Sequence, residues 1–139
     1  MSKSKTSPTA RTLKHLRERG WTCGVVEKFN SFIQRRQDLF GCIDVIAVHD
    51  DKGTLGVQAT SDQSGGNMQA RIEKAMAQED LRAWLRAGNR FQVFAWRKLK
   101  LFRGSKAVRW EAKIRELTLT ADGRREPPHV EVEIREIQE

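Results

Sequence analysis

Three polar side chains in otherwise apolar segments are the residues of this chain best suited to chemistry. Asp44 is the only charged residue in the apolar run 42–48. Gln58 lies inside a second apolar segment, and Glu27 interrupts an earlier β-forming stretch. A carboxylate or an amide within a sheet costs free energy unless another group compensates it. These three residues are therefore the candidates for a functional site.

The turn-forming residues 49–53 predict a β-hairpin that joins two of these segments. With a five-residue loop, Val48 lies opposite Thr54. Counting back along both arms places Asp44 opposite Gln58, and directly opposed residues share a face of the sheet.

Thr60 follows Gln58 by two residues, so the period of a strand places both side chains on one face. The same count sets Cys42 opposite Thr60. The hairpin is thus predicted to gather Asp44, Gln58 and Thr60 in one polar patch, which a slip of one residue would destroy.

Clustered oxygen ligands suit a hard cation, and Mg²⁺ usually takes only one or two carboxylates from a protein. Asp44 and Glu27 meet that requirement. On a phosphodiester, such a cation polarises the phosphoryl oxygen and lowers the pKa of a bound water. We expect Mg²⁺, with Mn²⁺ as an alternative. Each residue also has a plainer interpretation: Asp44 and Gln58 as buried groups bonded to their neighbours, and Glu27 as a surface ion pair with Lys28.

Hydrophobic periodicity and turn residues predict the elements that position this patch. The first is a helix over 9–19, with Thr9 as N-cap and Gly20 at its end, and a strand over 21–29 follows it. A polar connection of unassigned form over 30–40 leads to the hairpin strands 42–48 and 55–60. After a loop over 61–67 come a helix over 68–87 closed by Gly88, a strand over 91–96, and strands over 110–120 and 130–137 around a turn at 121–128. This order predicts an α/β fold in which helices flank a sheet.

The composition bounds the class of protein. The 139 residues are 38% hydrophobic and 32% charged, and contain no apolar run long enough to span a membrane, which predicts one soluble domain. The net charge of +8 predicts a polyanionic partner, with nucleic acid first. Two cysteines without metal-ligand spacing and a polar N-terminus favour the cytoplasm. Nucleotide-binding glycine loops, a nucleophile elbow and zinc-protease motifs are absent from the sequence.

The order and spacing of these segments resemble the PD-(D/E)XK nuclease superfamily, in particular its small phage-type and Holliday-junction-resolvase-like members. The likeness spans roughly residues 9–98 and rests on the Gly-Cys-Ile-Asp-Val-Ile-Ala-Val run, the short turn, Leu-Gly-Val-Gln-Ala-Thr-Ser and the following helix. It implies a restriction-endonuclease-like mixed sheet flanked by helices, formed by a core over 9–118. A flexible basic arm over 1–8 and a C-terminal β-hairpin extension over 119–139 complete the expected domain.

The resemblance also implies roles for individual residues. Asp44 takes the position of the motif's Asp, Gln58 the acidic position, Ala59 the position that offers its main-chain carbonyl, and Thr60 the Lys position. Glu27 is the candidate additional acid. Metal ligands would then be Asp44, Glu27, Gln58 and Ala59.

Two of these positions depart from the motif. Gln58 supplies a neutral oxygen, and Thr60 cannot supply an ammonium group. Ser61, Arg71 or Lys74 could take over part of the role of the lysine, and Thr60 or Ser61 would position the attacking water.

The sequence therefore predicts a Mg²⁺-dependent DNA endonuclease, in the bacterial host cytosol if phage-encoded. The resemblance alone implies that it acts as a homodimer and that branched or Holliday-junction DNA, beside duplex DNA, is its substrate. The candidate phosphate contacts are Arg11, Arg35, Arg36, Arg71, Lys74, Arg97 and Lys98. One alternative is a catalytically silent DNA-binding module with the same fold. A third is an RNA-binding or protein-interaction domain with an incidental polar patch.

Overall fold

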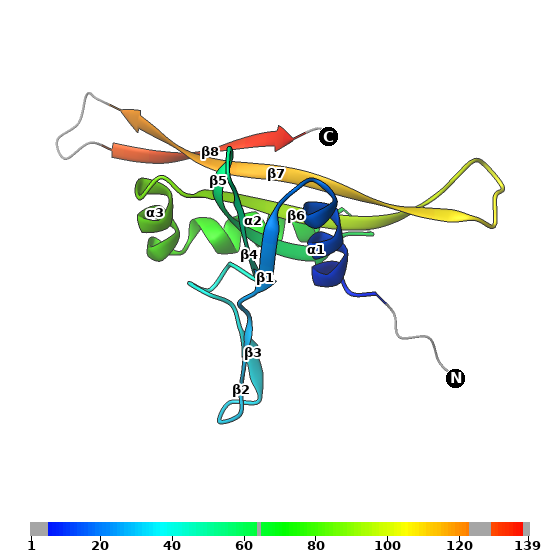
Figure 1. The fold of residues 1–139 in the computed structure, drawn as a ribbon, viewed down its shortest axis with the longest axis horizontal. Helices are drawn as coiled ribbons and strands as arrows, with labels where there is room; N and C mark the ends of the chain where they lie inside the picture. Colours follow the sequence, from blue (N-terminus) through cyan, green and yellow to red (C-terminus); the bar gives the residue numbers. More distant parts are fainter. Residues whose placement is uncertain (1–5, 64, 123–128, 138–139) are drawn as a thin grey trace.

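A six-stranded mixed sheet is the centre of the computed structural model, which describes residues 6–63, 65–122 and 129–137 (Figure 1). Its strand order is β1-β4-β5-β6-β7-β8. The strands are β1 (Thr22–Val25), β4 (Val45–His49), β5 (Gly53–Ser61), β6 (Arg90–Lys100), β7 (Val108–Asp122) and β8 (His129–Ile137). β5 and β6 pair in parallel, while the other pairs are antiparallel.

Helices flank this sheet, so the predicted α/β class is confirmed. The helices are α1 (Pro8–Glu18), α2 (Asn67–Met76) and α3 (Glu79–Arg86). The crossover from β5 to the parallel strand β6 runs through α2 and α3. The strands β2 (Lys28–Asn30) and β3 (Arg35–Gln37) form a separate hairpin that projects from the body of the protein (Figure 1).

Alternation along β5 and β6 builds an apolar core on each face of the sheet. On one face, Phe91 and Val93 pack with Ile72 of α2 and Leu81 of α3. On the other face, Val57 and Phe94 belong to the core that contains Leu16 of α1. Gln58 alternates with Val57 and pairs with Val93, so its side chain lies on the α2 face.

The hairpin of β4 and β5 has the predicted register, since Val48 pairs with Thr54. The loop is two residues shorter than predicted because His49 and Gly53 also pair. The ladder ends at Val45, and the preceding residues form a turn, so the predicted pairing of Cys42 with Thr60 is wrong.

Two other predicted elements are divided in the structure. The stretch 21–29 forms β1 and β2 in different sheets, because the chain leaves the large sheet after Val25. The helix predicted over 68–87 is interrupted at Gln78, whose φ of −90° and ψ of 116° are extended. Ile72 and Leu81 are nine residues apart, which places them about 180° apart around a continuous helix. Both face the core, so the helix has to break between them.

The helix ends follow the capping rules. Ser7, not Thr9, is the N-cap of α1, and its side chain accepts a hydrogen bond from the Ala10 N–H. Gly20 and Gly88 have φ of +89° and +91°, as expected for residues that end helices. No helix among the described residues is long and apolar enough to cross a membrane. Residues 1–5 of the expected arm and 123–128 of the expected C-terminal turn lie outside the described residues.

Candidate metal centre

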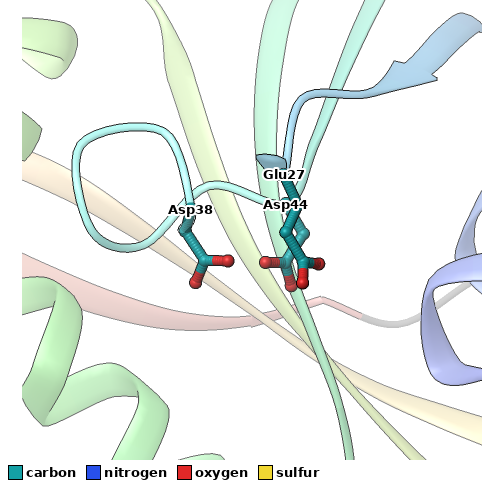
Figure 2. Close-up of side chains that lie close together, drawn as sticks. All are labelled: Glu27, Asp38 and Asp44. Atoms are coloured by element: carbon teal, nitrogen blue, oxygen red, sulfur yellow. The ribbon is translucent and has the colours of Figure 1, made fainter. Parts of the chain in front are cut away.

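Three carboxylates converge where the small hairpin joins the large sheet (Figure 2). Glu27, Asp38 and Asp44 each offer an oxygen, and the three oxygens lie within 4.8 Å of one another. Glu27 lies between β1 and β2, Asp38 directly follows β3, and Asp44 directly precedes β4. Asp44 is buried, with 4% of its surface exposed. Such a group of carboxylates resembles the donor set of a hard divalent cation.

A tight loop brings Asp38 and Asp44 together. Leu39 and Ile43 form an isolated antiparallel bridge with two backbone hydrogen bonds of 2.9 Å. Phe40 and Gly41 have φ of 53° and 73°, the left-handed values that allow this reversal. Because Leu39 and Ile43 are paired, the residues just outside them are neighbours.

The backbone next to Glu27 holds this residue close to Asp44. The N–H of Val26 donates to the carbonyl of Asp44 over 2.9 Å, and the N–H of Asp44 donates to the carbonyl of Val57 over 2.8 Å. The backbone of Asp44 is therefore fixed from both sides. The segments carrying Glu27 and Gln58 lie on those two sides.

Gln58 contacts the cluster and leaves one of its own polar atoms without a partner. Its Nε2 donates to Asp44 Oδ2 over 2.7 Å. Its Oε1 is buried and has no hydrogen-bond partner in the described part of the chain, although only 3% of the residue is exposed. A buried amide oxygen without a partner costs free energy. It is also a suitable ligand for a hard cation.

Ala59 contributes its main chain. The N–H of Ala59 donates to Asp44 Oδ2 over 2.9 Å. The N–H and C=O of one strand residue point toward the same neighbouring strand. The Ala59 carbonyl is therefore on the side of β5 where Asp44 lies, as its predicted role requires.

The cluster retains a proton when no cation is bound. Burial raises the pKa of Asp44 to about 8, and the hydrogen bond with Asp38 and the charges of Asp38 and Glu27 add to the rise, against the Ala59 N–H. Burial acts in the same direction on Asp38, but its hydrogen bonds with Asp44 and Lys74 and the charge of Lys74 outweigh it, so the pKa of Asp38 is lowered. A bound divalent cation would favour the ionised form of these carboxyl groups.

Lys74 supplies one cation from α2. Its Nζ lies 3.4 Å from Asp38 Oδ2, and its side chain is partly exposed. Arg71 is three residues earlier on the same helix, so the two side chains share one side of α2. Lys74 and Arg71 thus place positive charge on the side of α2 that faces Asp38.

The structure brings some predicted site residues together and leaves others apart. Glu27, Asp44, Gln58 and the main chain of Ala59 converge as described. Thr60 is buried on the same face as Gln58, and its hydroxyl donates to its neighbour's carbonyl, Ser61 O, over 3.3 Å. In the described ranges neither Thr60 nor Ser61 is hydrogen-bonded to the carboxylates, and Ser61 is exposed at the end of β5.

The predicted phosphate contacts occupy three regions. Arg35 and Arg36 are in β3, next to Asp38, while Arg71 and Lys74 are on α2. Arg97 pairs with Glu111 at 3.4 Å, and the N–H of Lys98 donates to the Gln63 side chain over 3.0 Å. Arg11 of α1 stacks on Trp110, with its guanidinium carbon 3.6 Å from the ring centroid. The two regions at β3 and α2 adjoin the carboxylates.

Asp38 is the site residue that the sequence analysis missed. It lies in the polar connection 30–40, to which the sequence analysis assigns no secondary structure. The available signal was its spacing, because Asp38 and Asp44 are each three residues from Gly41. A reversal at Gly41 brings two such residues side by side.

Comparison with protein-family models, with curated proteins and with solved structures gave no match for this chain. The chemistry of the carboxylate cluster is therefore the basis for proposing a function.

Proposed function

We propose that this protein is a divalent-metal-dependent DNA endonuclease, related in its site to the PD-(D/E)XK nucleases that its sequence resembles. The observation that carries the proposal is the meeting of three carboxylates within 4.8 Å beside the buried, unpartnered Oε1 of Gln58. Carboxylate clusters alone are common on proteins. A buried amide oxygen with no partner among the described residues indicates that a ligand belongs there.

The donor set fits Mg²⁺, with Mn²⁺ as the alternative. Glu27, Asp38 and Asp44 would hold the cation by their carboxylates, while Gln58 and the Ala59 carbonyl would add neutral oxygens. When bound, the cation polarises a phosphoryl oxygen and lowers the pKa of a coordinated water. Gln58 at the acidic position of the motif is compatible with this, because Asp38 provides a further carboxylate.

Lys74 is proposed to take the role for which the motif uses its lysine. Thr60 stands in that position and has no ammonium group. Lys74 approaches the cluster from α2, with its Nζ 3.4 Å from Asp38. Its charge would offset the phosphate and hold the scissile group against the carboxylates.

DNA is the proposed substrate because the whole chain carries a net charge of +8. Arg35 and Arg36 belong to β3, which ends just before Asp38, and Arg71 belongs to α2, which also carries Lys74. These arginines would contact phosphates on either side of the scissile bond. The resemblance further implies that two copies act together on duplex or branched DNA.

The deciding experiment compares cleavage by the wild type and by Asp44→Asn. Labelled linear duplex and four-way junction DNA are incubated with Mg²⁺, Mn²⁺ or EDTA. The wild type is expected to cleave only with a metal, and Asp44→Asn to lose at least about a hundredfold in rate with binding retained. Glu116→Gln, which changes a buried carboxylate outside the cluster, is the matched control. Undiminished cleavage by Asp44→Asn would refute the proposal.

A catalytically silent DNA-binding module is the second candidate. It is favoured by Gln58 and Thr60, which replace the acid and the lysine of the motif. Such a module would bind the same DNA and leave it intact with either metal. Lys74→Ala and Lys74→Arg separate the two candidates further, since only a nuclease loses cleavage with alanine and regains part of it with arginine.

A further inference from the structure

The hairpin of β2 and β3 is built directly onto the carboxylate cluster. Its ten residues, 28–37, begin immediately after Glu27 and end immediately before Asp38. The hairpin projects from the large sheet (Figure 1). The residues on either side of it, Glu27 and Asp38, carry two of the three carboxylates (Figure 2). Anything that the hairpin contacts is consequently held near the cluster.

The end of this hairpin is apolar and exposed. Phe32 is 97% exposed, and Phe29 and Ile33 are also largely exposed. Neither of the two cores described above includes these three residues. Several large exposed apolar side chains within one short segment are typical of an interaction site.

The turn at the tip is held in one conformation by its own polar groups. The N–H of Phe32 donates to Asn30 Oδ1 over 3.0 Å, and Gln34 Nε2 donates to the Ser31 carbonyl over 2.7 Å. Gln34 adopts a left-handed φ of 54°. The exposed ring is thus presented by an ordered turn, which lowers the entropy lost when it binds.

The charge of the hairpin identifies the class of partner. Residues 28–37 include three cations and no anion, namely Lys28, Arg35 and Arg36. An apolar tip on a cationic stem matches nucleic acid, in which bases stack on aromatic rings and phosphates attract the stem. Phenylalanine and isoleucine are among the side chains that proteins insert between base steps.

Building on the proposed nuclease function, we infer that the β2–β3 hairpin is a wedge that enters DNA where base stacking is interrupted. Phe32 and Ile33 would stack against the bases at a branch point or a frayed end, and the strand that continues past the stem would meet the carboxylates. The substrate class is therefore branched or partly unpaired DNA, and continuous duplex is disfavoured because its bases are already stacked.

The length of the hairpin also sets the distance of the cut from the branch. Phe32 is five residues from Glu27, and five extended residues span about 16 Å. Successive phosphates of one strand of duplex DNA are about 3.4 Å apart when measured along the helix axis. Cleavage is expected roughly five nucleotides from the branch point.

The test measures base unstacking without any metal. Wild type, Phe32→Ala and Phe102→Ala are titrated in EDTA onto a branched DNA that carries 2-aminopurine at the branch, and onto the matched linear duplex. Phe102 is a suitable control because it is 68% exposed in the loop of the other basic hairpin, between β6 and β7. Both phenylalanines are exposed, so neither substitution should unfold the protein.

The wild type and Phe102→Ala are expected to raise 2-aminopurine fluorescence and to prefer the branched DNA. Phe32→Ala should lose the fluorescence rise and bind the branch about tenfold more weakly, with binding to linear duplex unchanged. Equal behaviour of Phe32→Ala and the wild type would overturn the inference. A Phe32→Ala variant that binds DNA like the wild type but no longer binds anionic lipid vesicles would also overturn the inference, because the tip would then contact a membrane.

The outcomes separate this inference from the proposed function. A protein that cleaves branched and linear DNA alike, and is indifferent to Phe32→Ala, is a nuclease without a wedge. A protein whose branch preference depends on Phe32 but which never cuts with Mg²⁺ or Mn²⁺ has the wedge without the nuclease.

Discussion

Asp44 and Glu116 are two buried carboxylates on opposite faces of one sheet, and each accepts a hydrogen bond from a buried glutamine. Glu116 receives the Gln92 amide at 2.8 Å and two bonds from Arg90, at 2.7 and 3.2 Å. Asp44 accepts hydrogen bonds from the Gln58 amide and the Ala59 N–H, and it lies against two further carboxylates, one of which, Asp38, is hydrogen-bonded with it. Glu116 is thus paired with a cation, while Asp44 is placed among other carboxyl groups.

The difference teaches how a structural carboxylate can be told from a functional one. Burial of a charge is tolerable when a fixed cation and enough donors accompany it, as Arg90 accompanies Glu116. Beside Asp44, Lys74 pairs with Asp38 at 3.4 Å, and this lysine is partly exposed on α2. A fold that crowds three carboxylates in one place loses stability there, and function is the reason for which natural proteins accept such a loss.

The largest difference between the two sites should appear when each carboxylate is removed. Glu116→Ala leaves the partly buried Arg90 and the buried Gln92 without their acceptor, so the free energy of unfolding is expected to fall by about 3 kcal/mol. Asp44→Ala removes a carboxyl group that lies against two others and should cost much less. Urea denaturation in EDTA measures both. Equal losses would show that Asp44 is as structural as Glu116.

The sequence predicted the part of the site that follows from strand geometry. The pairing of Val48 with Thr54 and the shared face of Asp44 and Gln58 depend only on a turn and a period of two. Asp38 could not be placed in the same way. Its position depends on a reversal in which Phe40, a residue that seldom adopts a left-handed φ, does so before Gly41.

The division of the long helix shows a second limit of sequence reasoning. Apolar residues recur at helical spacing both before and after Gln78, so each half reads as a helix. Only the change of phase between Ile72 and Leu81 reveals the break, and a search for local periodicity does not detect it. The fold class survives this error because two short helices cover the sheet as one would.

The second difference between the carboxylates should appear on addition of metal. Mg²⁺ at about a hundred times its Kd is expected to raise the free energy of unfolding by about 2.7 kcal/mol, because it binds the folded chain. The free energy of unfolding of Glu116→Gln should rise by the same amount, although it is lower than that of the wild type without metal. The free energy of unfolding of Asp44→Asn should hardly rise. Thermal denaturation with Mg²⁺ and with EDTA tests this. A gain that Asp44→Asn retains would place the cation elsewhere.

The smallest difference concerns the metal-free protein and its dependence on pH. The pKa of Asp44, raised by burial to about 8, means that folding binds a proton at pH 7 that the unfolded chain does not hold. The wild type should therefore lose stability as the pH rises from about 4 toward 8. Asp44→Asn has no such proton to bind, so in EDTA at pH 7 it should be more stable than the wild type.

This advantage of Asp44→Asn should shrink toward pH 4, close to the ordinary pKa of an aspartate, because a large part of the unfolded chain then binds the same proton. Urea denaturation at pH 4.5 and 7.5 separates this effect from a general change in packing, which would not depend on pH. Glu116→Gln is the contrast, because it should be less stable than the wild type at pH 7.5. A gain from Asp44→Asn and a loss from Glu116→Gln would together identify one carboxylate as held for a ligand and the other as held for the fold.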